Sequence, residues 1–106
     1  MQLNFRGREM EKKQEFYDEV YKQGGSRRSY HRHYSESIYY PIWKKALELL
    51  KSNTLSPNIL DLGCGVGQFA NYLFDEGFYL YRGIDFSKEA ILLAQKVNYK
   101  YRNCFK

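Results

Sequence analysis

The chain has 106 residues, of which 43% are hydrophobic, and it carries a formal net charge of +5. This length allows one small domain, and this apolar content is typical of a globular rather than a disordered protein. No apolar run reaches the roughly 18 residues of a membrane span, and the N-terminus has no hydrophobic signal-peptide core. The two cysteines do not form the pattern of a disulfide framework, so we expect reduced thiols and a cytoplasmic location.

Two helices are predicted in the first half of the chain. Apolar residues at helical spacing indicate the first over about residues 8–22, and a glycine pair ends it. The second is expected to start at Tyr39 or Pro41, because proline suits a first helical position, and to run to Lys51.

A basic and aromatic segment separates these helices, over residues 22–34. It contains no acid and holds the bases Lys22, Arg27, Arg28 and Arg32. Arginine contacts to phosphate and tyrosine stacking on bases would suit a nucleic acid. Four bases in such a span are also common on a solvated loop, and we favour that interpretation. The alternative hypothesis is a non-catalytic nucleic-acid or regulatory binding module that uses this segment.

The second half of the chain alternates strands with helices. The expected elements are a strand at 59–62, a helix at 67–75, a strand at 79–85, a helix ending near residue 97 and the start of a third strand at 99–102. This alternation predicts an α/β fold with parallel strands, in which a ligand binds at the carboxyl ends of the strands.

The last of these helices has a clear start and a clear apolar face. Ser87 is a good N-cap, because its side-chain oxygen can accept a hydrogen bond from a free backbone N–H. We expect the helix to turn Ala90, Ile91, Ala94 and Val97 toward the core.

The stretch N-I-L-D-L-G-C-G-V-G-Q-F-A carries the strongest functional signal. Here the predicted first strand holds Asp61 and breaks into Gly63, Gly65 and Gly67 before a helix starts. Glycine tolerates positive φ and lets backbone N–H groups approach a ligand closely. The next strand ends in a second acid, Asp85, within G-I-D-F-S. Two strand-end acids around a glycine loop predict a pocket for a nucleoside-type cofactor.

The spacing of the glycines argues against two common phosphate-binding loops. A dinucleotide fingerprint places its third glycine where this chain has Gln68, which disfavours a nicotinamide-dependent oxidoreductase. A P-loop requires a lysine that is not present. An acid precedes the loop and no base lies near it, so a cationic or zwitterionic ligand suits it better than an anion.

The glycine loop and the G-I-D-F-S motif together resemble the first two motifs of class I S-adenosylmethionine-dependent methyltransferases, over about residues 58–96. The resemblance implies that Asp61 engages the amino end of the cofactor and that Asp85 accepts hydrogen bonds from both ribose hydroxyls, for which a carboxylate is suited. The implied cofactor-binding residues are Asp61, Gly63, Cys64, Gly65, Gly67, Asp85 and Phe86. No catalytic residue and no metal ligand is assigned.

A complete fold of the resembled family has about seven strands and needs roughly twice this length. We therefore expect a partial Rossmann-like parallel sheet with two N-terminal helices, truncated after the second or third strand. Residues 1–57 would form a helical lid on the substrate side, and residues 58–106 the first half of the cofactor-binding domain. We expect this fragment alone to lack methyltransferase activity and to be able to oligomerise through its exposed sheet edge.

The methyl acceptor is not identified by any motif, and we favour a small molecule over a nucleic acid. Cys64 has no histidine nearby in the sequence, so we interpret it as a small buried hydrophobic residue of the loop rather than a nucleophile.

Overall fold

The computed structural model describes residues 14–16, 19, 32–53 and 56–106. Residues 14–16 and 19 are helical, and the remainder of the helix predicted at 8–22 lies outside the described residues. So does most of the basic segment over residues 22–34, of which only the last three residues are described.

The described elements follow the predicted order closely. They are the 3₁₀ helix η3 (Tyr34–Glu36), α2 (Tyr40–Asn53), β1 (Ile59–Leu62), α3 (Gln68–Asp75), β2 (Tyr81–Ile84), α4 (Lys88–Val97) and the 3₁₀ helix η4 (Tyr99–Cys104). The second strand is shorter than the predicted span, because it begins at Tyr81 rather than at residue 79. No described helix is long and apolar enough to cross a membrane.

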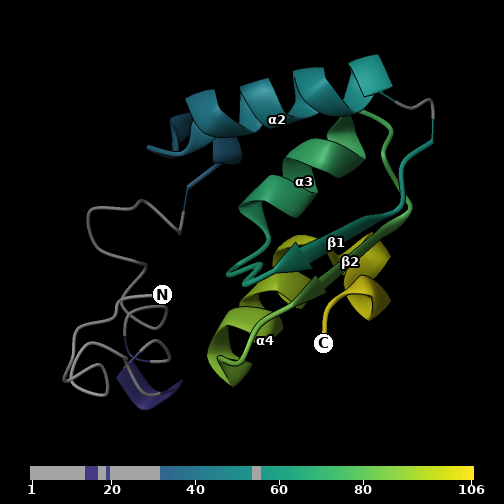
Figure 1. Ribbon diagram of the computed structural model, residues 1–106. Coiled ribbons are helices and arrows are strands. Elements are labelled where there is room, and N and C mark those ends of the chain that lie inside the picture. The colour runs from purple at the N-terminus through teal and green to yellow at the C-terminus, as the bar shows by residue number, and fades with distance from the viewer. Residues whose placement is uncertain (1–13, 17–18, 20–31, 54–55) are drawn as a thin grey trace, which may run out of the picture.

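The two strands form a parallel sheet in which α3 makes the connection (Figure 1). Ile59 lies opposite Tyr81, and Leu62 lies opposite Ile84. This arrangement confirms the predicted α/β class with a partial Rossmann-like sheet. It also brings the carboxyl ends of both strands to the same edge.

The prediction of a third strand at 99–102 was wrong. This stretch is the 3₁₀ helix η4, and a parallel bridge to Gly83 forms only at Phe105. Local contacts favour the tight turn: the Arg102 guanidinium donates to the Tyr99 carbonyl at 2.9 Å and lies 4.1 Å from the centre of its ring. The Tyr101 ring stacks on Phe74 with centroids 4.2 Å apart, which holds the turn against α3.

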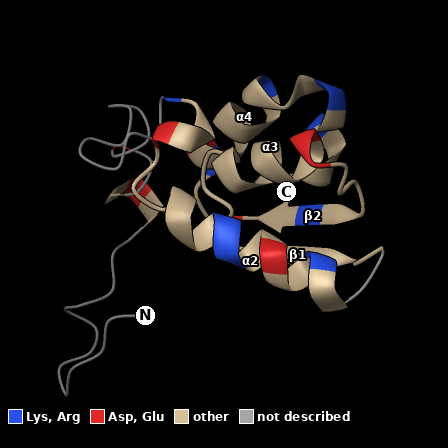
Figure 2. Cartoon of the chain, turned by 90° about the horizontal axis from the view of Figure 1, so that it is seen from above, with Lys and Arg blue, Asp and Glu red and all other residues tan. Residues whose placement is uncertain are grey.

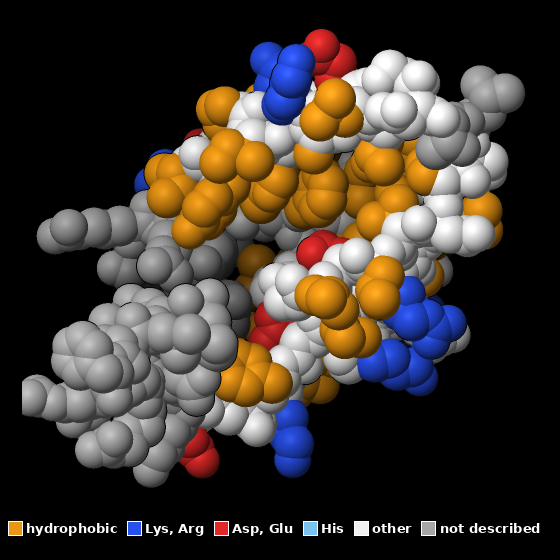
Figure 3. All heavy atoms as spheres, viewed as in Figure 1, with side chains coloured by type: hydrophobic (Ala, Val, Ile, Leu, Met, Phe, Trp, Pro, Cys, Tyr) orange, Lys and Arg blue, Asp and Glu red, His pale blue; other side chains and the backbone are white. Residues whose placement is uncertain are grey.

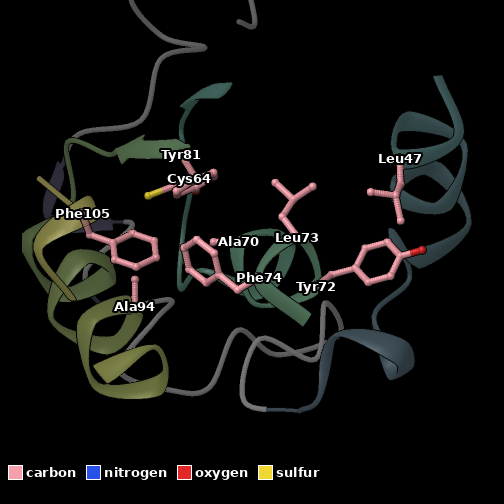
Figure 4. Packing of buried hydrophobic residues seen from close by; sticks show 9 residues of the cluster. All are labelled: Leu47, Cys64, Ala70, Tyr72, Leu73, Phe74, Tyr81, Ala94 and Phe105. Carbon is pink, nitrogen blue, oxygen red and sulfur yellow. The ribbon is translucent and has the colours of Figure 1, made fainter. Parts of the chain in front are cut away.

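Most of the core lies between the sheet and the helices α3 and α4, and Tyr72 and Leu47 extend it on the α2 side of α3 (Figure 4). Ala90 and Ala94 bring α4 close to it and have no exposed surface. The inward orientation predicted for Val97 was wrong, since 59% of that residue is exposed. The next residue, Asn98, takes the buried position at the end of α4 instead and is only 4% exposed.

Helix α2 lies along α3, on the side away from α4 (Figure 1). The Trp43 and Phe69 rings stack with centroids 5.7 Å apart, and Leu47 is buried in the core. At the other end of the contact, Lys51 Nζ lies 3.2 Å from Glu76 Oε1. Helix α2 is therefore held on α3 by an aromatic stack, a buried leucine and an ion pair.

One face of the sheet is exposed. Side chains alternate along the strands, so Asp61 and Tyr81 face the helices while Leu60, Leu62 and Ile84 face outward. Leu62 is 70% exposed, and Figure 3 shows hydrophobic side chains at the surface over the strands as well as along α2. Parallel sheets are ordinarily covered on both faces, so this surface is unusual for its class.

Candidate functional site

The glycine loop lies at the carboxyl edge of the sheet and is fastened to the end of β2. The backbone N–H groups of Gly63 and Cys64 both donate to the Ile84 carbonyl, at 2.8 and 2.9 Å. Asp61 precedes the loop on β1, and Asp85 follows Ile84 directly. The fold therefore brings together the two acids and the loop that the sequence had singled out.

Asp85 connects the end of β2 to both neighbouring turns. Its Oδ2 accepts a hydrogen bond from the Gly65 N–H at 2.9 Å, and its Oδ1 accepts one from the Ser87 N–H at 2.9 Å. Ser87 is the N-cap of α4, as predicted, and its hydroxyl oxygen accepts from the Ala90 N–H at 3.1 Å. Asp85 thus fixes the loop against the start of α4.

The first glycine of the loop faces open space. Gly63 has a φ of +76°, and a Cβ placed on it would meet no atom of the described residues within 4 Å. Phe86 lies after Asp85 and is 57% exposed. A planar apolar ligand group could therefore lie against Phe86 while the rest of the ligand reaches the backbone at Gly63.

The third glycine faces the interior. A Cβ on Gly67 would lie 2.7 Å from Asn98 Nδ2 and 3.1 Å from Ala94 Cβ. Asn98 Nδ2 donates to the Gly67 carbonyl at 3.2 Å, and its Oδ1 accepts from Asn71 Nδ2 at 3.0 Å. This pair of amides, which we call the Asn71–Asn98 clamp, holds the back of the loop to α3 and α4.

Asp61 is paired with a tyrosine from the neighbouring strand. The Tyr81 hydroxyl donates to Asp61 Oδ2 at 2.7 Å. Burial raises the pKa of Asp61 above its ordinary value, the Asp85 charge adds to the rise, and the bond from Tyr81 opposes it. Burial and the Asp61 carboxylate raise the pKa of Tyr81, so its hydroxyl keeps its proton and remains a donor.

Cys64 lies in the middle of the loop and is buried against the sheet. Burial raises the pKa of its thiol to about 12, and the nearby charges of Asp61 and Asp85 act in the same direction. A thiol is a nucleophile only as the thiolate. The buried position agrees with the interpretation of Cys64 as a packing residue, and the raised pKa disfavours nucleophilic chemistry.

The roles of three residues in this region were not predicted from the sequence. Asn98 donates to the Gly67 carbonyl, 31 residues before it in the chain. Tyr81 donates to Asp61, 20 residues before it. Gln68 Nε2 donates to the Arg32 carbonyl at 2.9 Å, which fixes the chain before η3 beside the start of α3. Only Tyr81 had a sequence signal: it precedes Gly83 by two residues, so that in a strand both share one face.

Charge on the described helices is mixed. Figure 2 shows basic and acidic residues side by side on α2, where Lys45 and Glu48 form an ion pair at 3.4 Å. Within the part of the chain that the structure describes, no group of three or more metal-binding side chains comes together. The basic segment behind the nucleic-acid hypothesis lies almost wholly outside those residues, so that hypothesis stays untested.

A family model described as a methyltransferase domain matches residues 30–104, which is more than two thirds of the chain. The match covers the described part from η3 to η4 and includes the glycine loop, both acids and the Asn71–Asn98 clamp. A search of curated proteins found no match.

Proposed function

Because the chain belongs to this methyltransferase domain family, we propose that it binds S-adenosylmethionine between the glycine loop and Asp85. One observation carries the proposal: Asp61, the open backbone at Gly63 and the Asp85 carboxylate meet at the carboxyl edge of a parallel sheet. That edge is where ligands of open α/β sheets bind. When bound, the cofactor supplies an activated methyl group on its sulfonium sulfur.

The described residues fit such a ligand. Each Asp85 oxygen already accepts one backbone N–H, and each has a second lone pair with which it can accept a ribose hydroxyl. Asp61 offers a negative charge to the ligand's ammonium group. Phe86 offers an apolar surface to the adenine.

The other loop residues take supporting roles in this proposal. Gly63 is exposed and brings backbone close to the methionine part of the ligand. Cys64, Gly65 and Gly67 are buried, so they shape the loop from behind, and the Gly65 N–H holds Asp85 in place. Methyl transfer depends chiefly on positioning and on exclusion of water, so no catalytic base is required of these residues.

We also propose that residues 1–57 cover the site as a lid, while residues 58–106 hold the cofactor. The bond from Gln68 to the Arg32 carbonyl supports this, because it anchors the N-terminal region next to the helix that follows the glycine loop. A small-molecule acceptor, a cytoplasmic location and self-association through the sheet remain parts of the same proposal.

Calorimetric titration with S-adenosylhomocysteine tests the cofactor site. We expect the wild-type chain to bind and Asp85→Ala to lose binding by at least about tenfold, since charged hydrogen bonds contribute ~1.5–3 kcal/mol. Asp75→Ala is a matched control, because Asp75 also accepts a hydrogen bond, from Tyr34 at 2.7 Å, but lies at the far end of α3.

Asp85 also holds the loop in place, so Asp85→Ala could lose binding because it unfolds. Thermal unfolding of each variant shows whether it is folded at the temperature of the titration. Equal affinity of the wild-type chain and a folded Asp85→Ala variant would contradict the proposed site. So would a folded wild-type chain that does not bind S-adenosylhomocysteine.

A further inference from the structure

Tyr81 reaches Asp61 by an unusual path. Asp61 lies opposite Gly83 in the sheet, and Tyr81 precedes Gly83 by two residues on the same face. To make its 2.7 Å bond to Asp61, the Tyr81 ring therefore has to extend along the strand over Gly83.

Gly83 leaves the space that this path needs. A Cβ on Gly83 would lie 2.6 Å from the Tyr81 hydroxyl oxygen and 2.9 Å from Cys64 Cβ. Gly83 is not one of the glycines that have a positive φ. Its lack of a side chain therefore matters because it leaves space, and not because it gives the backbone freedom. The glycine of G-I-D is thus matched to the tyrosine two residues before it.

The Tyr81 ring is held on two further sides. Phe74 meets it edge to face with centroids 5.4 Å apart, and Phe105 lies 5.7 Å from it. Tyr81 is only 6% exposed, so its hydroxyl cannot turn to water instead. The bond to Asp61 is therefore fixed by packing and not only by its own strength.

The groups that face Asp61 are one hydrogen-bond donor, one like charge and one neutral thiol. Tyr81 donates to it from β2, Asp85 bears a like charge at the end of β2, and the Cys64 thiol lies close by on the loop. With Oδ2 held by Tyr81, Oδ1 is the atom that remains for a ligand.

We propose that Tyr81 is a positioning residue of the cofactor site, which orients the Asp61 carboxylate toward the ammonium group of an amino-acid-bearing nucleoside. This rests on the proposed function of the chain. It means that the Tyr81 hydroxyl, through Asp61, makes the site prefer ligands that carry the amino-acid part. Tyr81 touches Asp61 and not the ligand.

Two nucleosides separate this role from general support of the fold. S-Adenosylhomocysteine carries the ammonium group, and 5′-methylthioadenosine keeps the adenosine but lacks the amino-acid part. Both are titrated into the wild-type chain, Tyr81→Phe and Tyr72→Phe. Tyr72 is the matched control, because it is a buried tyrosine of the same core, 8% exposed, whose ring packs on Tyr34 and Tyr40 instead.

We expect Tyr81→Phe to bind S-adenosylhomocysteine about fivefold more weakly, the equivalent of one hydrogen bond of ~1 kcal/mol, and methylthioadenosine with unchanged affinity. Tyr72→Phe should leave the ratio of the two affinities unchanged. The bond from Tyr81 favours the charged form of Asp61, so its loss should raise the pKa of Asp61. As the pH is lowered, Tyr81→Phe should therefore lose its preference for S-adenosylhomocysteine at a higher pH than the wild-type chain does.

An equal loss for both nucleosides, or no loss for either, overturns the role of Tyr81. A wild-type chain that binds neither nucleoside overturns the proposed function itself, so the two failures are distinct. If Tyr81→Phe does not fold, Asp61→Asn serves as the second variant, since its amide oxygen can still accept the hydroxyl but carries no charge. Retention of the wild-type preference by Asp61→Asn would also overturn the proposal.

Discussion

The two ends of the glycine loop use the same residue type for opposite reasons. Within the part of the chain that the structure describes, an added Cβ at Gly63 would meet nothing within 4 Å, whereas at Gly67 it would lie 2.7 Å from the buried Asn98 amide. Both have positive φ, +76° and +78°. The front of the loop is thus open, as the proposed ligand site requires, and the back is filled by the protein's own core. Substitutions at the two ends should therefore fail in different assays.

The largest effect is expected for Gly67→Ala. The added methyl group would combine positive-φ strain with overpacking against Asn98 and Ala94, at a cost of about 3 kcal/mol in the free energy of unfolding. Gly77→Ala is the matched control, because Gly77 has a φ of +89° but open space around it, so only the strain of about 1 kcal/mol applies. Urea unfolding measures both, and equal losses would show that Gly67 is not packed as described.

Removal of the Asn71–Asn98 clamp should rank second. Asn98→Ala leaves the Asn71 side-chain amide without its partner and removes one of the two hydrogen bonds to the Gly67 carbonyl, which keeps the bond from the Asn71 backbone N–H at 2.8 Å; we expect a cost of about 2 kcal/mol. It also removes the atom nearest to a methyl group at position 67. In a double-mutant cycle, Gly67→Ala should therefore cost less in the Asn98→Ala background, and strict additivity of the two losses would argue against the contact.

A smaller loss of stability, about 1 kcal/mol, is expected for Gly63→Ala, because only backbone strain applies in open space. Its affinity for S-adenosylhomocysteine should nevertheless fall by at least about tenfold, since the methyl group would occupy the surface offered to the ligand. Calorimetry beside urea unfolding separates the two quantities. An unchanged affinity would place the ligand away from this end of the loop.

The smallest effect is expected for Asp61→Asn, and it has the opposite sign. The folded-state pKa of Asp61 is raised above 3.8, so the fold loses stability as the pH rises above 3.8, and the loss is complete once the pH exceeds the folded-state pKa. Asp61→Asn should therefore melt at a higher temperature than the wild-type chain at pH 7, and this gain should disappear as the pH falls toward 3.8. A variant that is less stable at pH 7 would contradict the raised pKa.

The parts of the site that could be predicted from sequence depend on short spacings. The positive φ of the three alternate glycines, the bond from the Ser87 N–H to Asp85 and the Ser87 cap are local features, so they follow from local pattern. The back of the loop could not be predicted, because Asn98 lies 31 residues from the carbonyl it holds. An asparagine after a helix has no spacing that distinguishes a buried clamp from an ordinary cap.

The error at the third strand has a similar cause. Tyrosines at 99 and 101 alternate as they do in a strand, and alternation was the only local signal available. The contacts of Arg102 with Tyr99 and of Tyr101 with Phe74 select a 3₁₀ turn instead. The second of these contacts depends on the placement of α3, which the local sequence does not contain.

The residues that hold the glycine loop lie far from it in the sequence, which has a consequence for the order of folding. The glycine loop is closed by Asp85 and Asn98, and the strand position beside β2 is filled only at Phe105. A growing polypeptide emerges N-terminus first, and contacts between distant residues form slowly. The loop therefore leaves the ribosome before Asp85 and Asn98, which fasten it, and we expect its final geometry to form only after both residues have been synthesised.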